Sequence, residues 1–139
     1  RGGNGAGGGD GGFAGGGNTS VSVTDGALNI IGNLAVAANA RGGNGGTGGD
    51  GGNATDGEAR FEASNANITF TPNAQGERTL FVDASNQGGS GVAQGGNGEA
   101  GDAGVEIRGS AVSGLTLNVL ANGTGGEASG AAGVGGNPR

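Results

Sequence analysis

The chain has 139 residues, of which 40 are glycine, and a net charge of −6 at pH 7. It contains no Cys, Met, Trp, Tyr, His or Lys, so most side chains that act as general acids, bases or nucleophiles are missing. Its six basic residues, all arginine, are scattered and do not form the cationic stripe that binds a phosphate backbone. We therefore predict that the protein is not an enzyme. We expect no catalytic, cofactor-binding or metal-binding residues and no nucleic-acid partner.

No stretch of the chain is apolar enough to cross a bilayer. A spanning helix needs about 20 consecutive apolar residues, and one of the longest apolar runs here is residues 34–38. We therefore expect no membrane span. The chain opens on Arg1 without an initiator Met or a signal peptide, which predicts a processed product or a segment of something longer.

The sequence repeats itself with a period of about 40 residues. The pentapeptide RGGNG at residues 1–5 recurs at 41–45, and GGDGG at residues 8–12 recurs at 48–52. A third, more divergent copy begins near the GGNG of residues 95–98. We expect a single repetitive domain, residues 1–139, or a segment of a longer array. Its units cover about residues 1–40, 41–85 and 86–121, and a closing glycine tract covers 122–139.

Each unit is a glycine tract followed by a β segment. The tracts cover about residues 1–17, 41–57, 86–104 and 122–137. The β segments cover about residues 18–40, 58–85 and 105–121, where polar and apolar residues alternate as in half-buried strands. Asp25-Gly26 is a turn signal between two such strands.

The alignment of the units predicts which apolar residues stack on one another. An insertion around residues 73–78 of the second unit shifts the alignment that follows it. The predicted stacks are Val21 on Phe61 and Val105, Val23 on Ala63 and Ile107, Leu28 on Ile68, Ile30 on Phe70, and Leu34 on Leu80 and Leu117.

These segments predict an all-β fold without α-helix. Three short strands in about 22 residues match one coil of a right-handed parallel β-solenoid (β-helix), whose coils stack about 4.8 Å apart. A β-sandwich of hairpins is the alternative. The solenoid is favoured because the pattern repeats by whole units and the inward-facing residues stay in phase.

The glycine tracts have a period of three. Residues 42–53 read GGN, GGT, GGD, GGN, which is typical of a left-handed threefold helix of the polyglycine II type. Collagen is excluded because neither of the two prolines lies in such a run. A straight tract would run about 46 Å, so each tract must fold out and back or wrap as an extra side of the coil. The alternative is a flexible glycine loop.

A calcium-binding nonapeptide, Gly-Gly-x-Gly-x-Asp, is only half present. Its Asp position falls on Gly7, Thr47 and Ala100, so the motif is not supported. The candidates for binding a cation in another geometry are Asp10, Asp50 and Asp102. The simpler interpretation is that these carboxylates keep the glycine surface solvated.

Four Asn-x-Ser/Thr triplets begin at Asn18, Asn53, Asn67 and Asn122, and chance explains them in a chain this rich in Asn, Ser and Thr. Asparagine has a structural use here, because it tolerates left-handed corners and can stack in ladders.

The segments GGNGGTGGDGGNAT, ARFEASNANITFT and LNIIGNLAVAANARGGNGG resemble the glycine-rich repeats of giant bacterial surface proteins. These are the filamentous-haemagglutinin-like and autotransporter-type adhesins of Gram-negative bacteria. The glycine triplets also resemble those of mycobacterial surface proteins and phage tail adhesins, although neither explains the β segments as well. The adhesin resemblance covers nearly the whole chain and implies a secreted β-helical stalk or fibre that attaches cells to surfaces.

We therefore expect a structural component of an extracellular or bacterial cell-surface filament or adhesin stalk that self-assembles by stacking. Its expected partners are itself, as a head-to-tail or lateral homopolymer, or neighbouring repeats of the same chain, with surface polysaccharide as a further candidate. The alternative is an ice- or carbohydrate-binding glycine-rich module. A β-helical polysaccharide lyase or hydrolase would need a cleft with clustered basic residues and carboxylates. We expect no cofactor.

Overall fold

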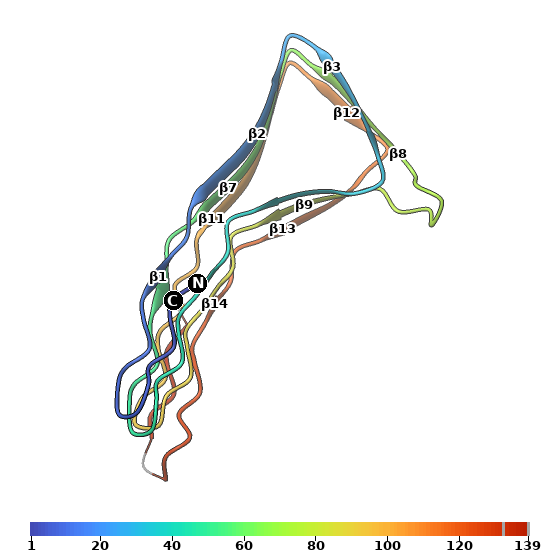
Figure 1. Cartoon of the computed structure of the whole chain (residues 1–139). Coiled ribbons are helices and arrows are strands. Elements are labelled where there is room, and N and C mark those ends of the chain that lie inside the picture. Colours follow the sequence, from blue (N-terminus) through green and yellow to red (C-terminus); the bar gives the residue numbers. More distant parts are fainter. Residues whose placement is uncertain (132, 139) are drawn as a thin grey trace.

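The computed structural model describes residues 1–131 and 133–138. This part of the chain is all-β, without helix, and its paired strands are parallel. Figure 1 shows two regions, a triangular coil region and a long, narrow glycine arm that extends from one of its corners. The chain passes through both regions in every repeat.

The coil region has three sides, and each side is a sheet of three parallel strands from successive units. The sheets consist of β2 (Asn18–Thr24), β7 (Glu58–Ser64) and β11 (Asp102–Arg108); β3 (Ala27–Ile31), β8 (Asn67–Thr71) and β12 (Ala111–Ser113); and β4 (Leu34–Ala37), β9 (Thr79–Asp83) and β13 (Thr116–Leu120).

The strand register agrees with the predicted stacks. Val21 pairs with Phe61 and Phe61 with Val105, while Leu34 pairs with Leu80 across the insertion. The other predicted pairs are also found: Val23 with Ala63, Ala63 with Ile107, Leu28 with Ile68, Ile30 with Phe70, and Leu80 with Leu117. Parallel pairing across whole units matches the predicted solenoid-like stacking and not a sandwich of hairpins, whose adjacent strands would be antiparallel.

The first corner of each coil is made by a residue in the left-handed region of backbone conformation. Asp25, Asn65 and Gly109 have φ angles of 51°, 50° and 55°. Asp and Asn tolerate this region better than most other side chains do. The three residues follow β2, β7 and β11, so the same turn recurs in each coil.

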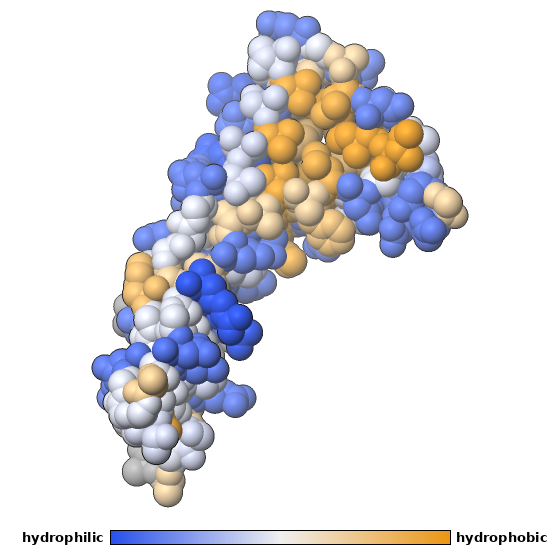
Figure 2. Space-filling view, viewed as in Figure 1, coloured by the Kyte–Doolittle hydropathy of each residue, from blue (hydrophilic) through white to orange (hydrophobic). Residues whose placement is uncertain are grey.

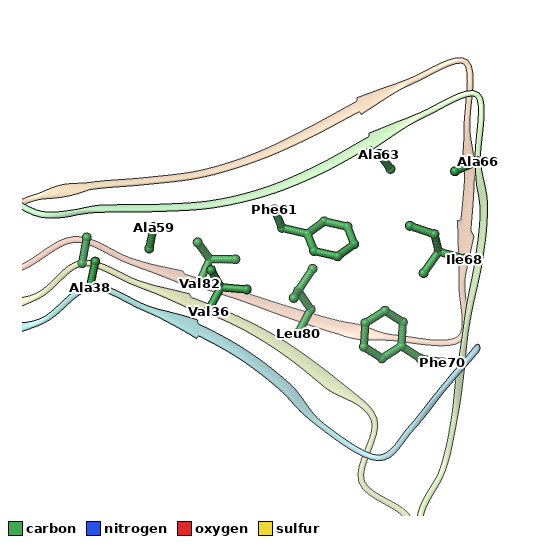
Figure 3. Packing of buried hydrophobic residues seen from close by; sticks show 11 residues of the cluster. Val36, Ala38, Ala59, Phe61, Ala63, Ala66, Ile68, Phe70, Leu80 and Val82 are labelled. Carbon is green, nitrogen blue, oxygen red and sulfur yellow. The ribbon is translucent and has the colours of Figure 1, made fainter. Parts of the chain in front are cut away.

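The hydrophobic core is complete only in the middle coil (Figure 3). Phe61, Ile68, Phe70, Leu80 and Val82 all have 2% or less of their surface exposed. Their side chains point into the triangle from β7, β8 and β9. The corresponding residues of the first and third coils pack against this cluster from one side only and are largely half-buried.

The glycine arm contains four tracts, and each of them folds out and back (Figure 1). We name as outward legs residues 2–5, 42–45, 88–91 and 125–128, and as return legs residues 11–14, 51–54, 95–98 and 135–138. Short strands lie where the arm joins the coil region: β1 (Ala14–Gly15), β5 (Ala40–Arg41), β6 (Ala54–Thr55), β10 (Asn86–Gln87) and β14 (Gly123–Thr124).

Backbone hydrogen bonds connect the legs in two directions. Along the stack, the N–H of Gly2 donates to the carbonyl of Arg41 at 2.9 Å and the N–H of Gly5 to that of Asn44 at 2.8 Å. Across the arm, the N–H of Gly12 donates to Gly3 at 2.7 Å, and the N–H of Gly43 donates to Gly12 at 2.9 Å. The second pattern continues as a zigzag through Gly52, Gly89, Gly96, Gly126 and Gly136.

The third glycine tract is shorter than the sequence predicted. We expected it to continue to residue 104, but β11 begins at Asp102, and Gly104 lies in that strand opposite Arg60. The position faces outward, since the side chains of adjacent residues alternate between the two faces of a strand and Ala103 and Val105 pack against the core. The three-residue spacing of the glycines therefore does not show where the tract ends.

Candidate interaction surfaces

In the triplet at residues 42–44, the two glycines are required for different reasons. A Cβ on Gly42 would lie 1.9 Å from the carbonyl oxygen of Gly52, on the return leg of the same tract. A Cβ on Gly43 would lie 1.9 Å from the carbonyl oxygen of Gly3, on the outward leg of the preceding tract. Both contacts are with backbone, which cannot give way cheaply. Side chains are therefore excluded at both glycine positions of this triplet, and similar close approaches to backbone recur at Gly51 and Gly52.

Where the third residue of a triplet is Asn or Asp, its side chain connects successive tracts. The Oδ1 atom of Asn4 accepts the backbone N–H of Asn44 at 3.0 Å, and Oδ1 of Asn44 accepts that of Ser90 at 3.1 Å. The same bond joins Asp10 to Asp50 at 2.9 Å and Asp50 to Gln94 at 3.1 Å. A third column runs from Asn53 through Asn97 to Asn137.

These ladders account for two of the three aspartates considered as cation ligands. Asp10 and Asp50 accept backbone hydrogen bonds within the stack, and Asp102 lies at the start of β11, opposite Glu58 of β7. Across residues 1–131 and 133–138, no three His, Cys, Asp or Glu side chains are grouped closely enough to hold a metal ion. Of the four Asn-x-Ser/Thr asparagines, Asn18 and Asn67 begin β2 and β8. Asn53 and Asn122 directly precede β6 and β14, and Asn53 takes part in a ladder.

Asn86 fastens the arm to the coil region. It is 2% exposed, and its Oδ1 accepts the backbone N–H of Ala40 at 2.7 Å. Its Nδ2 donates to the carbonyls of Asp56 at 2.9 Å and Glu99 at 2.6 Å. One buried amide therefore joins the chain entering the second coil, the chain entering the third coil and the chain leaving the first, which fixes the junction.

The outer face of β7 and β11 carries exposed charges. Arg60 pairs with Glu58 and lies 3.9 Å from Glu62, and Arg108 pairs with Glu106. A hollow of about 460 Å³ lies beside Arg60, where Gly104 has no side chain to fill it. Exposed ion pairs of this kind each contribute between about 0 and 1 kcal/mol, so this face does not hold the fold together.

The carboxylate of Asp83, at the end of β9, accepts hydrogen bonds from several neighbouring donors. Partial burial works against the charged form. Hydrogen bonds from the side chains of Ser85 and Asn39 and from the backbone of Ser85 outweigh that effect and hold the pKa of Asp83 below its usual value. The Nδ2 of Asn39 lies 2.9 Å from Oδ2, and the backbone nitrogen of Ser85 lies 3.0 Å from Oδ1.

Both ends of the coil stack are apolar and uncovered. Figure 2 shows hydrophobic residues gathered inside the triangular outline, while the arm is mainly glycine and polar. On the third coil, Ile107, Leu117 and Val119 are 48%, 49% and 42% exposed. Around them lies a groove of about 270 Å³ whose floor includes Phe61 and Leu80 of the middle coil. Apolar side chains that belong to a core pattern therefore face solvent at this end.

Comparisons with family models, curated proteins and solved structures find no match. The geometry of the described residues is thus the basis for a functional assignment. No helix in the described part of the chain is long and apolar enough to cross a membrane.

The sequence predicted the composition of these surfaces better than their connections. The triplet period indicated that Asn and Asp project from one side of each tract. It did not identify the buried amide of Asn86, because this residue stands at the start of an irregular, glycine-rich stretch that resembles a loop. The only available signal was its alignment with Ala40, an inward-facing alanine.

Proposed function

We propose that this protein is a structural component of an extracellular or cell-surface filament or adhesin stalk, and that it acts by stacking and not by catalysis. The observation that carries the proposal is that both the coils and the glycine tracts stack in register, while the two ends of the stack stay open. A stack of this kind is quasi-one-dimensional, because each unit contacts only its neighbours.

The incomplete core supports this role. The middle coil is buried because a coil covers it on each side, whereas Ile107 and Leu117 of the third coil are about half exposed. Natural solenoids cover such ends with polar or irregular caps, and neither end of this coil stack has one among the described residues.

The glycine tracts suit a stalk as well. We propose that the legs are threefold helices of the polyglycine II type, since Gly2 and Gly5, three residues apart, both donate to the next tract. Such an arm is stiffened by bonds in two directions, and its flat, side-chain-free interior leaves little for a small ligand to bind. For the winding of the coils we propose a right hand, the hand that parallel crossover connections adopt in nearly all proteins.

The extracellular location rests on the resemblance to bacterial adhesin repeats. The chain contains no cysteine, so its stability does not depend on the redox state of the compartment. A net charge of −6 favours a solvated surface with little affinity for nucleic acid.

The test is electron microscopy of the purified chain across a concentration series, together with light scattering. We expect filaments whose length and mass grow in steps of one chain. A monodisperse monomer at every concentration would reject the stalk proposal. If that monomer shows thermal hysteresis in ice growth, or is retained on a polysaccharide column, the binding-module alternative is favoured.

A further inference from the structure

The residues that the structure describes give no reason why position 3 is glycine. Its counterparts in the later tracts are Gly43, Gly89 and Gly126, and a Cβ on each would lie 1.9–2.0 Å from a carbonyl oxygen of the preceding outward leg. At Gly3 a Cβ would meet nothing within 4 Å. The φ angle of Gly3 is also outside the left-handed region that favours glycine. A further leg lying on the first tract, as each later outward leg lies on the one before it, would make glycine necessary there.

The backbone groups at the two edges of the arm are complementary. Inside the chain, Gly42 donates to Gln87 and Gly88 donates to Thr124, each to the following tract. At the last tract, the equivalent N–H of Gly125 has no acceptor in residues 1–131 and 133–138, and neither do those of Ala128 and Gly135. At the first tract, the matching carbonyls of Arg1, Asn4 and Asp10 have no donor in the same residues.

We propose that the edge of the first tract binds the edge of the last tract of a second copy of this chain. This inference rests on the stalk proposal above and specifies its contact surface. In this register Gly125 donates to Arg1 of the second copy, Ala128 to Asn4 and Gly135 to Asp10. The interface repeats the contact that the chain already makes between its first and second, second and third, and third and fourth tracts. One position of this interface forms no bond. Pro138 of the last tract corresponds to Gly98 of the third, whose N–H donates to Asn137, and proline has no N–H to donate.

The two regions of the molecule differ in depth, and this fixes the geometry of the assembly. The described chain has four glycine tracts but three coils, since β14 stacks on β10 and no strand stacks on β13 beyond β9. Copies joined edge to edge through their arms therefore leave a space one coil deep between the third coil of one copy and the first coil of the next. Each copy then advances the filament by four layers, or about 19 Å at about 4.8 Å per layer.

The alternative contact, coil on coil, gives a different repeat. Direct stacking of the third coil on the first coil of another copy advances the filament by three layers, about 14 Å. It also places the last tract of one copy in the same layer as the first tract of the next. The arms would then have to separate, which breaks the hydrogen bonds between the last two tracts.

The test compares Gly3→Ala with the matched variant Gly104→Ala in the full chain. Gly104 also has nothing within 4 Å of its Cβ position, but it faces outward from β11, away from both ends of the stack. Both variants are expected to fold, which circular dichroism and thermal melting check. Gly3→Ala should raise the concentration needed for assembly at least about tenfold, because a methyl group would meet backbone in the neighbouring leg. Gly104→Ala should assemble as the unaltered chain does.

The axial rise per subunit, measured by electron microscopy of the unaltered filaments, is the second readout, and about 19 Å is expected. Filaments that tolerate Gly3→Ala, or that have a rise of about 14 Å, would overturn this interface and leave the stalk proposal standing. An unaltered chain that stays monomeric throughout the concentration series would overturn both.

Discussion

Gly43 lies directly against Gly3 of the preceding tract, so that a Cβ on Gly43 would come within 1.9 Å of the Gly3 carbonyl oxygen. The N–H of Gly43 donates to Gly12 on the return leg, while its own carbonyl accepts the N–H of Gly52. The residue therefore contacts three legs at once. Its place in the arm depends on the absence of a side chain more than on backbone flexibility.

We predict that Gly43→Ala destabilises the protein by about 3 kcal/mol or more. This is the net loss, after the small stabilisation that alanine gives by lowering the conformational entropy of the unfolded chain. The legs would have to separate to admit the methyl group, and several hydrogen bonds would be lost with them. Urea denaturation followed by circular dichroism measures the change. Gly104→Ala, which faces solvent from β11, is the control and should stay within about 0.5 kcal/mol of the unaltered chain. Equal stability of the two variants would show that the arm is not ordered as described.

A second prediction concerns the core of the middle coil. Phe61→Ala removes a fully buried ring from the core cluster, and it should cost about 3–5 kcal/mol. Phe13→Ala is the same substitution at a ring that is 63% exposed, so it should cost less than about 1 kcal/mol. Thermal unfolding of both variants under the same conditions gives the comparison. A similar cost at both positions would contradict the burial pattern.

The sequence predicted the coils well because their pattern is simple. Val21, Phe61 and Val105 alternate with polar neighbours, and a period of two leaves one choice of inward face. The insertion before Leu80 could also be located, since the apolar pattern resumes unchanged after it.

The arm was less predictable because a glycine, which has no side chain, does not indicate which side of the backbone is buried. A period of three is compatible both with a tract that folds back and with one that wraps as a fourth side, and the choice depends on contacts between tracts. Gly104 shows the same limit, since its spacing fitted the tract while its pairing with Arg60 placed it in a strand. The position of Asn86 depends on Asp56 and Glu99, which approach it only after the tracts have folded.

A third prediction addresses this junction. Asn86→Ala leaves the N–H of Ala40 and the carbonyls of Asp56 and Glu99 without their partner. A buried polar group without a hydrogen bond costs about 1–3 kcal/mol, so the variant should lose at least about 3 kcal/mol of unfolding free energy. Asn118→Ala, on the exposed face of β13, is the matched control and should be nearly neutral. Hydrogen exchange at Ala40 supplies a local readout, because its amide should exchange faster in Asn86→Ala even under conditions where the rest of the chain stays folded. Unchanged protection of this amide would rule out the buried bond.

The last prediction is a dependence of stability on acid that centres on Asp83. Its pKa is lowered in the folded protein, so the charged form contributes stability that is fully present above the unfolded value of about 3.9 and is lost as the pH falls through the folded value. Asp83→Asn removes this term and replaces an acceptor oxygen with an amide that faces the N–H of Ser85 or the amide of Asn39. We therefore expect Asp83→Asn to be less stable than the unaltered chain at pH 7, and the gap to narrow below about pH 4.

Denaturant titrations at several pH values between 7 and 2.5 measure this gap. Asp25→Asn serves as the control, since it also removes one carboxylate, its side chain has no hydrogen bond within the described residues, and asparagine holds the same left-handed corner at Asn65. A gap for Asp83→Asn that is constant over this pH range would show that the donors around Asp83 do not stabilise its charge. A gap that narrows only for Asp83→Asn would tie part of the acid sensitivity of the stack to the hydrogen bonds that Ser85 and Asn39 make to Asp83.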